Sequence, residues 1–171
     1  MDVSAAVAFG WARAAGAGLQ FRRITEADLP FLAKLYTSTR ADELAVTGWT
    51  DEVKAQFLEQ QFRAQHAHYQ QYYPQADWLL TMRAGEAIGR LYIERWPSQH
   101  CLIDIAFLPE HRGKGLGSAL LRDLMDEAAA EGKDVSIHVE KFNPAMRLYK
   151  SLGFVTEEDK GVYNLMRWRA A

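Results

Sequence analysis

A basic, glycine-rich segment, His111–Gly117 (HRGKGLG), is the part of this sequence best suited to chemistry. It lies between an apolar run, Cys101–Leu108, and an amphipathic run, Ser118–Gly132, an order that predicts a strand, a turn and a helix. The first N–H groups of a helix lack partners within it and carry partial positive charge, so they bind phosphate. We therefore predict a pyrophosphate site formed by Arg112, Gly113, Lys114, Gly115, Leu116, Gly117 and Ser118.

The spacing of the glycines excludes two familiar nucleotide-binding motifs. A P-loop requires a Lys-Ser/Thr pair after its last glycine, and no such pair follows Gly117. The dinucleotide fingerprint G-x-G-x-x-G would need its third glycine at position 118, which is Ser118. The pattern that remains is Arg112-x-x-Gly115-x-Gly117.

The elements that must position this turn follow from the spacing of apolar residues along the chain from Leu19 onward. Thr25 and Asn143 suit helix N-caps, and Gly132 suits a helix end. We predict strands at 19–24, 78–82, 87–93, 101–108, 135–140, 154–157 and 162–168, and helices near 25–36, 50–70, 118–132 and 143–152. Residues 1–18 carry little pattern and are predicted to be an N-terminal extension, either flexible or a short extra helix, before one domain at 19–171.

A second segment, Asn143–Phe154 (NPAMRLYKSLGF), covers the helix expected after the strand at 135–140. It resembles the N-x-x-A-x-x-L-Y-x-x-L-G-F segment of the GNAT superfamily of N-acetyltransferases, and residues 112–117 resemble that family's R/Q-x-x-G-x-G/A motif. The element order β-α-α-β-β-β-α-β-α-β-β is also similar to that of the family. The resemblance implies an α/β (α+β) fold with a mixed, mostly antiparallel central sheet of about seven strands, flanked by helices.

The resemblance also implies acetyl-CoA as co-substrate. In the family the pantetheine arm pairs with the splayed end of a strand, which here is expected at Ile105, Ala106 and Phe107. A bulge in this strand, before Pro109, would free a backbone N–H to polarise the thioester carbonyl. Asn143 is a further candidate for contact with the coenzyme. However, Asn143 and Tyr149 are six positions apart rather than the family's seven, so Asn143 either contacts the coenzyme or only caps its helix.

Acetyl transfer requires a base for the amine proton, since an alkyl amine with a pKa of ~10.4 is mostly protonated at pH 7. The candidates are Asp104, His138 and Glu140. His138 occupies the strand position where some relatives carry a catalytic glutamate, and the alternative is a structural histidine. Asp104 could instead bind a cationic substrate, and Glu140 could be merely solvated.

The departing thiolate needs an acid, and Tyr149 resembles the family's tyrosine in that role. The alternative is a core tyrosine on an apolar stripe. The acceptor side would be shaped by the first two helices, with an aromatic-rich stretch at Phe57–Tyr73. That stretch is either an aromatic wall for a cation or apolar side chain, or a core-facing stripe with tyrosines at a dimer surface.

Composition restricts the function further. The 171 residues are 49% apolar with a formal net charge of −2, which suits one domain and argues against nucleic acid as a partner. No apolar run approaches the ~20 residues of a membrane span, and the start of the chain lacks a signal-peptide pattern. The single cysteine, Cys101, is expected to be a buried, inert thiol and fits the cytoplasm. His66-x-His68 and His100-Cys101 lack further ligands in the sequence, so we expect no metal.

The sequence therefore predicts an acetyl-CoA-dependent N-acetyltransferase that acts on a primary amine of a small molecule or peptide. The alternative is a non-catalytic acyl-CoA-binding or regulatory module of the same fold. Analogy with the family also allows a homodimer.

Overall fold

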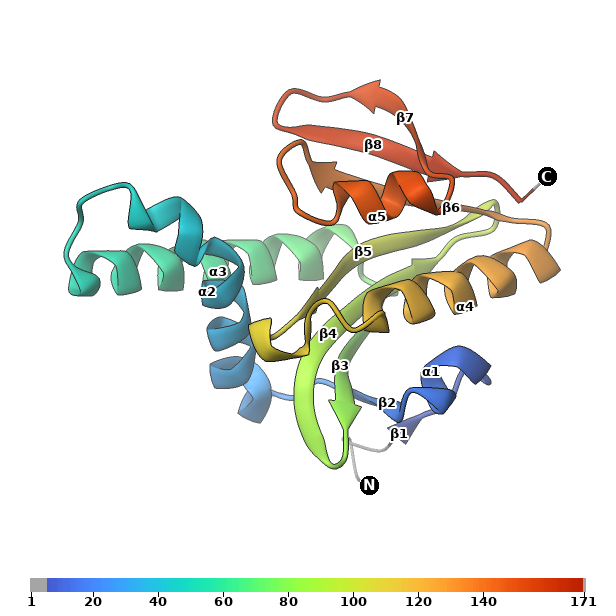
Figure 1. The fold of residues 1–171 in the computed structure, drawn as a ribbon, viewed down its shortest axis with the longest axis horizontal. Coiled ribbons are helices and arrows are strands. Elements are labelled where there is room, and N and C mark those ends of the chain that lie inside the picture. The colour runs from blue at the N-terminus through green and yellow to red at the C-terminus, as the bar shows by residue number, and fades with distance from the viewer. Residues whose placement is uncertain (1–5, 171) are drawn as a thin grey trace.

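Eight strands form one mixed sheet in the computed structural model, which describes residues 6–170 (Figure 1). The strand order is β1-β2-β3-β4-β5-β6-β8-β7, and β5 and β6 form the one parallel pair among the described strands. The strands are β1 (Ala6–Val7), β2 (Leu19–Arg23), β3 (Asp77–Arg83), β4 (Glu86–Arg95), β5 (Gln99–Phe107), β6 (Asp134–Glu140), β7 (Val155–Asp159) and β8 (Tyr163–Trp168). The helices are α1 (Ala12–Gly16), α2 (Leu29–Ala45), α3 (Asp51–Tyr72), α4 (Leu116–Ala130) and α5 (Met146–Ser151), with 3₁₀ turns at Glu26–Asp28 and Pro109–His111.

The predicted fold class is confirmed: the sheet is mixed, mostly antiparallel and flanked by helices. The seven expected strands are present, and the eighth is the two-residue β1, which pairs with β2. Residues 12–16 form a short extra helix, α1, whose Ala14 N–H donates to the Asp123 carboxylate of α4 at 2.8 Å. Since Trp11 and Ala14 are buried in the main core, residues 6–18 pack with the rest of the fold. Residues 1–5 of the expected extension lie outside the described residues.

Helices cover both faces of the sheet (Figure 1). On one face, α1, α4 and α5 enclose the larger core, to which α4 contributes the predicted stripe of Leu116, Leu120, Leu124 and Ala128. On the other face, α2 and α3 pack through Leu32 and Phe62 against Leu80 of β3. None of the described helices is both long and apolar enough to span a bilayer.

Two helix starts differ from the sequence prediction. α4 begins at Leu116 rather than Ser118, because Gly115 takes a left-handed conformation (φ 78°) and serves as the N-cap. α5 begins at Met146 rather than at Asn143-Pro144, because a tight turn precedes it, closed by a 3.0 Å bond from Met146 N–H to the Asn143 carbonyl.

Candidate functional site

The glycine-rich turn owes its shape to two backbone positions that disfavour other residues. Gly113 and Gly115 have φ values of 72° and 78°, in the left-handed region that glycine enters without steric cost. The third glycine, Gly117, is helical, and a Cβ placed there would lie 3.7 Å from Leu148 of α5, an ordinary contact. The turn thus leads directly into the first turn of α4, whose N–H groups have no acceptors within the helix. Free N–H groups at a helix start are what the predicted phosphate site would need.

Arg112 holds the turn in place rather than extending from it. Its Nε donates to the carbonyl oxygen of Phe107 at 2.8 Å, and its Nη2 donates to Ser38 Oγ of α2 at 3.1 Å. These bonds join the turn to the end of β5 and to the helix pair on the other face. Lys114 lies exposed in the same turn. The contact of Arg112 with Ser38 could not be predicted from local patterns, because the two residues are 74 positions apart.

The sheet opens beside this turn, between β5 and β6 (Figure 1). The two strands pair only over Gln99–Leu102 and Asp134–Ile137, so within the described residues Ile103–Phe107 has no partner on the β6 side. On its other side β5 carries a bulge, although not at Ile105–Phe107, where it was expected, because these residues pair regularly with β4. Leu102 lies opposite Ile93, Asp104 lies opposite Tyr92, and Ile103 is the extra residue. The bulge therefore lies at the beginning of the unpaired stretch that includes Ile105, Ala106 and Phe107.

Gly89 of β4 borders the opening of the sheet and was not among the residues expected at the site. A Cβ at this position would collide with the carbonyl oxygen of Ala106 and lie 3.0 Å from the Phe107 ring. Glycine therefore permits β4 to approach the very stretch of β5 that faces the opening. An isolated glycine within a strand pattern signals such a close approach, so the sequence did contain a hint.

Tyr149 lies on the inner face of α5, buried to 2% exposure. Its ring packs edge-on against Phe154, with centroids 5.9 Å apart. Burial, and secondarily the charge of Asp104, raises the pKa of the phenol above its ordinary value. The hydroxyl is therefore protonated at neutral pH, which is the state that a proton donor requires.

Asp104 is near enough to Tyr149 to affect it, but its carboxylate is already engaged. It forms an ion pair with the guanidinium of Arg90, a buried residue that also donates from Nη2 to Gln65 Oε1 at 2.9 Å. Although burial alone would lower the pKa of Arg90, the charge of Asp104 raises it above its ordinary value. Arg90 is therefore a permanent cation, and Asp104 serves to neutralise it.

His138 lies on β6 with an exposed side chain. Its Nε2 is 3.3 Å from Nζ of Lys160, and partial desolvation together with the charge of Lys160 lowers the pKa of the imidazole. The ring is consequently neutral at pH 7 and able to accept a proton. Among the residues that the structure describes, no hydrogen bond or ion pair joins His138 to Asp104 or Tyr149.

Glu140 and Asn143 both have structural partners. Glu140 accepts two hydrogen bonds from Arg40 of α2, at 2.6 and 3.1 Å, so it is ion-paired rather than merely solvated. Asn143 Oδ1 accepts from the Ala145 N–H at 2.8 Å. This bond closes a turn before α5, whose N-cap is Ala145, so Asn143 does not cap the helix as expected.

The aromatic residues on and beside α3 fall into a buried group and an exposed group. Tyr69 and Tyr73 pack with Tyr92 of β4 in a buried cluster on the sheet, as expected of a core-facing stripe. Trp49 and Phe57, by contrast, are exposed and pack against each other with centroids 5.3 Å apart.

A mixed sheet that opens next to a glycine-rich helix start is the arrangement seen in acetyltransferases, and a family match agrees with it. Residues 41–154 match the Acetyltransferase (GNAT) family, and the chain belongs to this family.

Relatives support the same class. Over 49 residues the chain is 51% identical to the L-amino acid N-acyltransferase MnaT of Escherichia coli (strain K12), a match that covers 28% of each chain. Over 57 residues it is 44% identical to Cysteine-rich protein 2-binding protein of Homo sapiens, which covers 32% of this chain and 7% of that protein. The chain thus matches only a minor part of either relative's length. The crystal structure of PaiA N-acetyltransferase from Thermoplasma acidophilum in complex with coenzyme A has a TM-score of 0.66 and 16% identity, covering 88% of this chain and 98% of that one.

Proposed function

We propose that this protein is an acetyl-CoA-dependent N-acetyltransferase that transfers the acetyl group from the thioester to a primary amine by direct attack. The observation that carries the proposal is the continuity of two features: the stretch Ile103–Phe107, which is unpaired on the β6 side, leads through the 3₁₀ turn Pro109–His111 into the glycine-rich turn. An extended arm with amides needs a free strand edge, and a pyrophosphate needs a helix N-terminus. Membership of the GNAT family and the coenzyme A held by the PaiA structure support the same donor.

The donor half of the site uses backbone groups. The N–H groups from Gly113 to Ser118 bind the pyrophosphate, with Lys114 as a nearby positive charge. The edge of Ile105, Ala106 and Phe107 pairs with the amides of the pantetheine arm. At the Ile103 bulge, a backbone N–H stabilises the developing negative charge on the carbonyl oxygen, and loss of one such donor typically costs about 10²–10³-fold in rate.

The reaction then needs two proton transfers. The amine nitrogen attacks the thioester carbon and forms the C–N bond, and His138, directly or through water, takes the proton that the nitrogen loses. The C–S bond breaks as the tetrahedral intermediate collapses. Tyr149 donates its phenolic proton to the departing sulfur and regains a proton from solvent. Asp104 supports the site by neutralising Arg90 rather than by acting as the base.

The acceptor is an amine of a small molecule or peptide. MnaT, by its name, acts on L-amino acids, so amino acids belong in any first panel of acceptors. We also propose a cytoplasmic location, since the single cysteine is a buried free thiol. A homodimer is proposed by family analogy.

A thiol-release assay with acetyl-CoA and a panel of amines tests the function. The panel should include amino acids, polyamines and peptides with free N-termini, and the expected result is amine-dependent release of coenzyme A. Calorimetry with acetyl-CoA tests the alternative. Tight binding of acetyl-CoA, with no release of coenzyme A in the presence of any amine, would indicate a non-catalytic acyl-CoA-binding module. Absence of both binding and release would contradict the proposal itself.

A further inference from the structure

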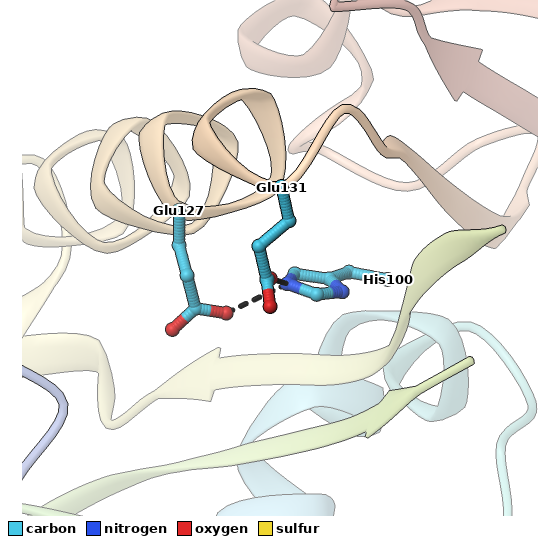
Figure 2. A group of neighbouring side chains, drawn as sticks. All are labelled: His100, Glu127 and Glu131. Carbon is cyan, nitrogen blue, oxygen red and sulfur yellow. Dashed lines mark ion pairs between the residues drawn. The ribbon is translucent and has the colours of Figure 1, made fainter. Parts of the chain in front are cut away.

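Three side chains from two distant segments converge near the C-terminal end of α4 (Figure 2). His100 comes from the start of β5, Glu127 from the last turn of α4, and Glu131 is the residue directly after α4. The two glutamates are four positions apart and so lie on one side of the helix end. His100 Nε2 lies 2.7 Å from Glu127 Oε2 and 3.0 Å from Glu131 Oε2. The cluster is separate from the glycine-rich turn, because the 15 residues of α4 span about 22 Å.

The histidine is the unusual member of this cluster. His100 is completely buried, and neither ring nitrogen has a partner with hydrogen-bond geometry among the described residues. The two carboxylate oxygens are close to Nε2, but they lie away from the direction in which a ring N–H would donate. A buried polar group without a hydrogen bond is destabilising, so such a group calls for a ligand that the protein itself does not supply.

The surroundings hold Glu127 in place as a ligand. Arg95 donates to both oxygens of Glu127, at 2.9 and 3.0 Å, and Trp11 Nε1 donates to Oε1 at 3.2 Å. A carboxylate oxygen has two acceptor sites, so Oε2 retains one that can face His100. Hydrogen bonds of this kind commonly orient carboxylates that bind metals.

The charges near the cluster leave a negative balance for a cation. Arg95 bonds to Glu127 and also donates from Nη1 to Asp77 at 2.8 Å, and Asp77 pairs with Arg23 at 3.7 Å as well. The two arginines therefore face three carboxylates, those of Asp77, Glu127 and Glu131. A metal-bound imidazole is neutral, so one negative charge would remain on these side chains for the cation to neutralise.

We propose that His100, Glu127 and Glu131 bind a divalent transition-metal ion, with Zn²⁺ as the expected one, through Nε2 and one oxygen of each carboxylate. A nitrogen with two carboxylate oxygens suits Zn²⁺ better than Mg²⁺, which prefers oxygen ligands alone. Tetrahedral bonds of about 2.0–2.1 Å separate ligand atoms by about 3.3 Å, so the nitrogen–oxygen distances of 2.7 and 3.0 Å would have to lengthen by about 0.6 and 0.3 Å. Glu131 is 48% exposed, which leaves an entry path and room for a water as fourth ligand. The ion would tie the start of β5 to the end of α4 and stabilise the fold.

Calorimetry with Zn²⁺ on the metal-stripped full chain tests this proposal. Glu131→Gln removes one ligand at an exposed position, and Glu52→Gln on the exposed surface of α3 is the matched control. We expect one Zn²⁺ per chain in the wild type and in Glu52→Gln. Loss of a supporting residue alone costs 10–100-fold in metal affinity, so loss of the Glu131 ligand should cost about 100-fold or more. Zn²⁺ should also raise the Tm of the wild type but not of Glu131→Gln, and Mg²⁺ should do neither.

Two outcomes would overturn the site. Equal Zn²⁺ affinity for the wild type and Glu131→Gln would place the ion elsewhere. Absence of Zn²⁺ binding to the wild type, a measurement that depends on no variant, would leave His100 as a histidine that bridges two glutamates without a metal. Neither outcome bears on the acetyltransferase proposal, whose site lies at the other end of α4.

Discussion

Asp104 and Arg90 form an ion pair between neighbouring strands, beside the place where β5 separates from β6. Arg90 is almost completely buried, whereas the side chain of Asp104 is about one-quarter exposed in the opening. The opening of the sheet thus exposes the Asp104 carboxylate, whose charge is neutralised by the buried guanidinium of Arg90. This relationship explains how the protein tolerates a buried guanidinium next to its candidate site.

Asp104→Asn should destabilise the protein, because it leaves the charge of Arg90 buried and unpaired. Breaking one side of a buried pair costs about 3–5 kcal/mol. Asp126→Asn is the matched control, since it breaks an exposed pair with Arg13 and should cost about 1 kcal/mol or less. Urea unfolding of the two variants measures the difference. A stable Asp104→Asn protein with lost turnover would instead make Asp104 the catalytic base.

Gly115→Ala and Gly117→Ala should behave differently, although the two positions are only two residues apart. An alanine at the left-handed position 115 costs about 1–2 kcal/mol and shifts the N–H groups of the turn, so acetyl-CoA should bind more weakly. At helical position 117 a Cβ meets only ordinary contacts, and replacing a helical glycine by alanine gains about 0.5–1 kcal/mol. Urea unfolding and calorimetry with acetyl-CoA check both effects. Similar losses of affinity in both variants would contradict this account of the turn.

Tyr149→Phe should reduce kcat about 10²–10⁴-fold, the usual contribution of a positioned acid. Acetyl-CoA affinity should change little, because the ring and its packing on Phe154 remain. Tyr72→Phe, at an exposed tyrosine of α3, is the control and should leave kcat unchanged. Thiol release and calorimetry on the same preparations provide the two measurements. Unchanged turnover in Tyr149→Phe would remove Tyr149 as the acid.

The fold could be predicted from the sequence because local signals determine most of it. The spacing of Gly113, Gly115 and Gly117 gave both the turn and the helix after it, and two φ values in the left-handed region explain why. The partners of the site residues could not be predicted. Arg90 and Asp104 are 14 positions apart and meet only because β4 and β5 pair with a bulge between them, a register that periodicity alone does not reveal.

The same limit explains why the sequence analysis found no metal ligands beside His100. Glu127 and Glu131 follow it by about one strand and one helix, and in the sequence they look like ordinary solvated residues at the end of α4 and just after it. Only the packing of the end of α4 against the start of β5 brings the three side chains within 4.8 Å. The spacing of apolar residues predicts which face of a helix or strand is buried, but not which residues of another element that face will contact.

The pH dependence of turnover should identify His138 if it is the base. Its pKa lies below the ordinary value of 6.5, because of partial desolvation and the charge of Lys160. The imidazole therefore stays neutral to lower pH, and kcat/KM should fall only as pH drops through this lowered pKa. Lys160→Gln removes the neighbouring charge and should shift this acidic fall in kcat/KM to higher pH. Lys141→Gln, whose lysine pairs with Asp159, should not shift it. A limb that persists unchanged in His138→Gln would assign the base elsewhere.

Glu127 should make stability depend on acidity even in the absence of metal. Burial raises the pKa of this carboxyl, but its contacts with His100 and Arg95 outweigh burial and lower the pKa from 4.5 to about 2. Its contribution to the free energy of unfolding is therefore complete above pH 4.5 and is lost as pH falls through about 2. A shift of this size corresponds to on the order of 3 kcal/mol, since one pKa unit is worth about 1.4 kcal/mol. Urea unfolding of wild type and Glu127→Gln from pH 6 down to pH 2 or so, with a chelator present, should show the two stabilities converging as the pH falls. Parallel curves would mean that Glu127 is not held in its charged form by these contacts.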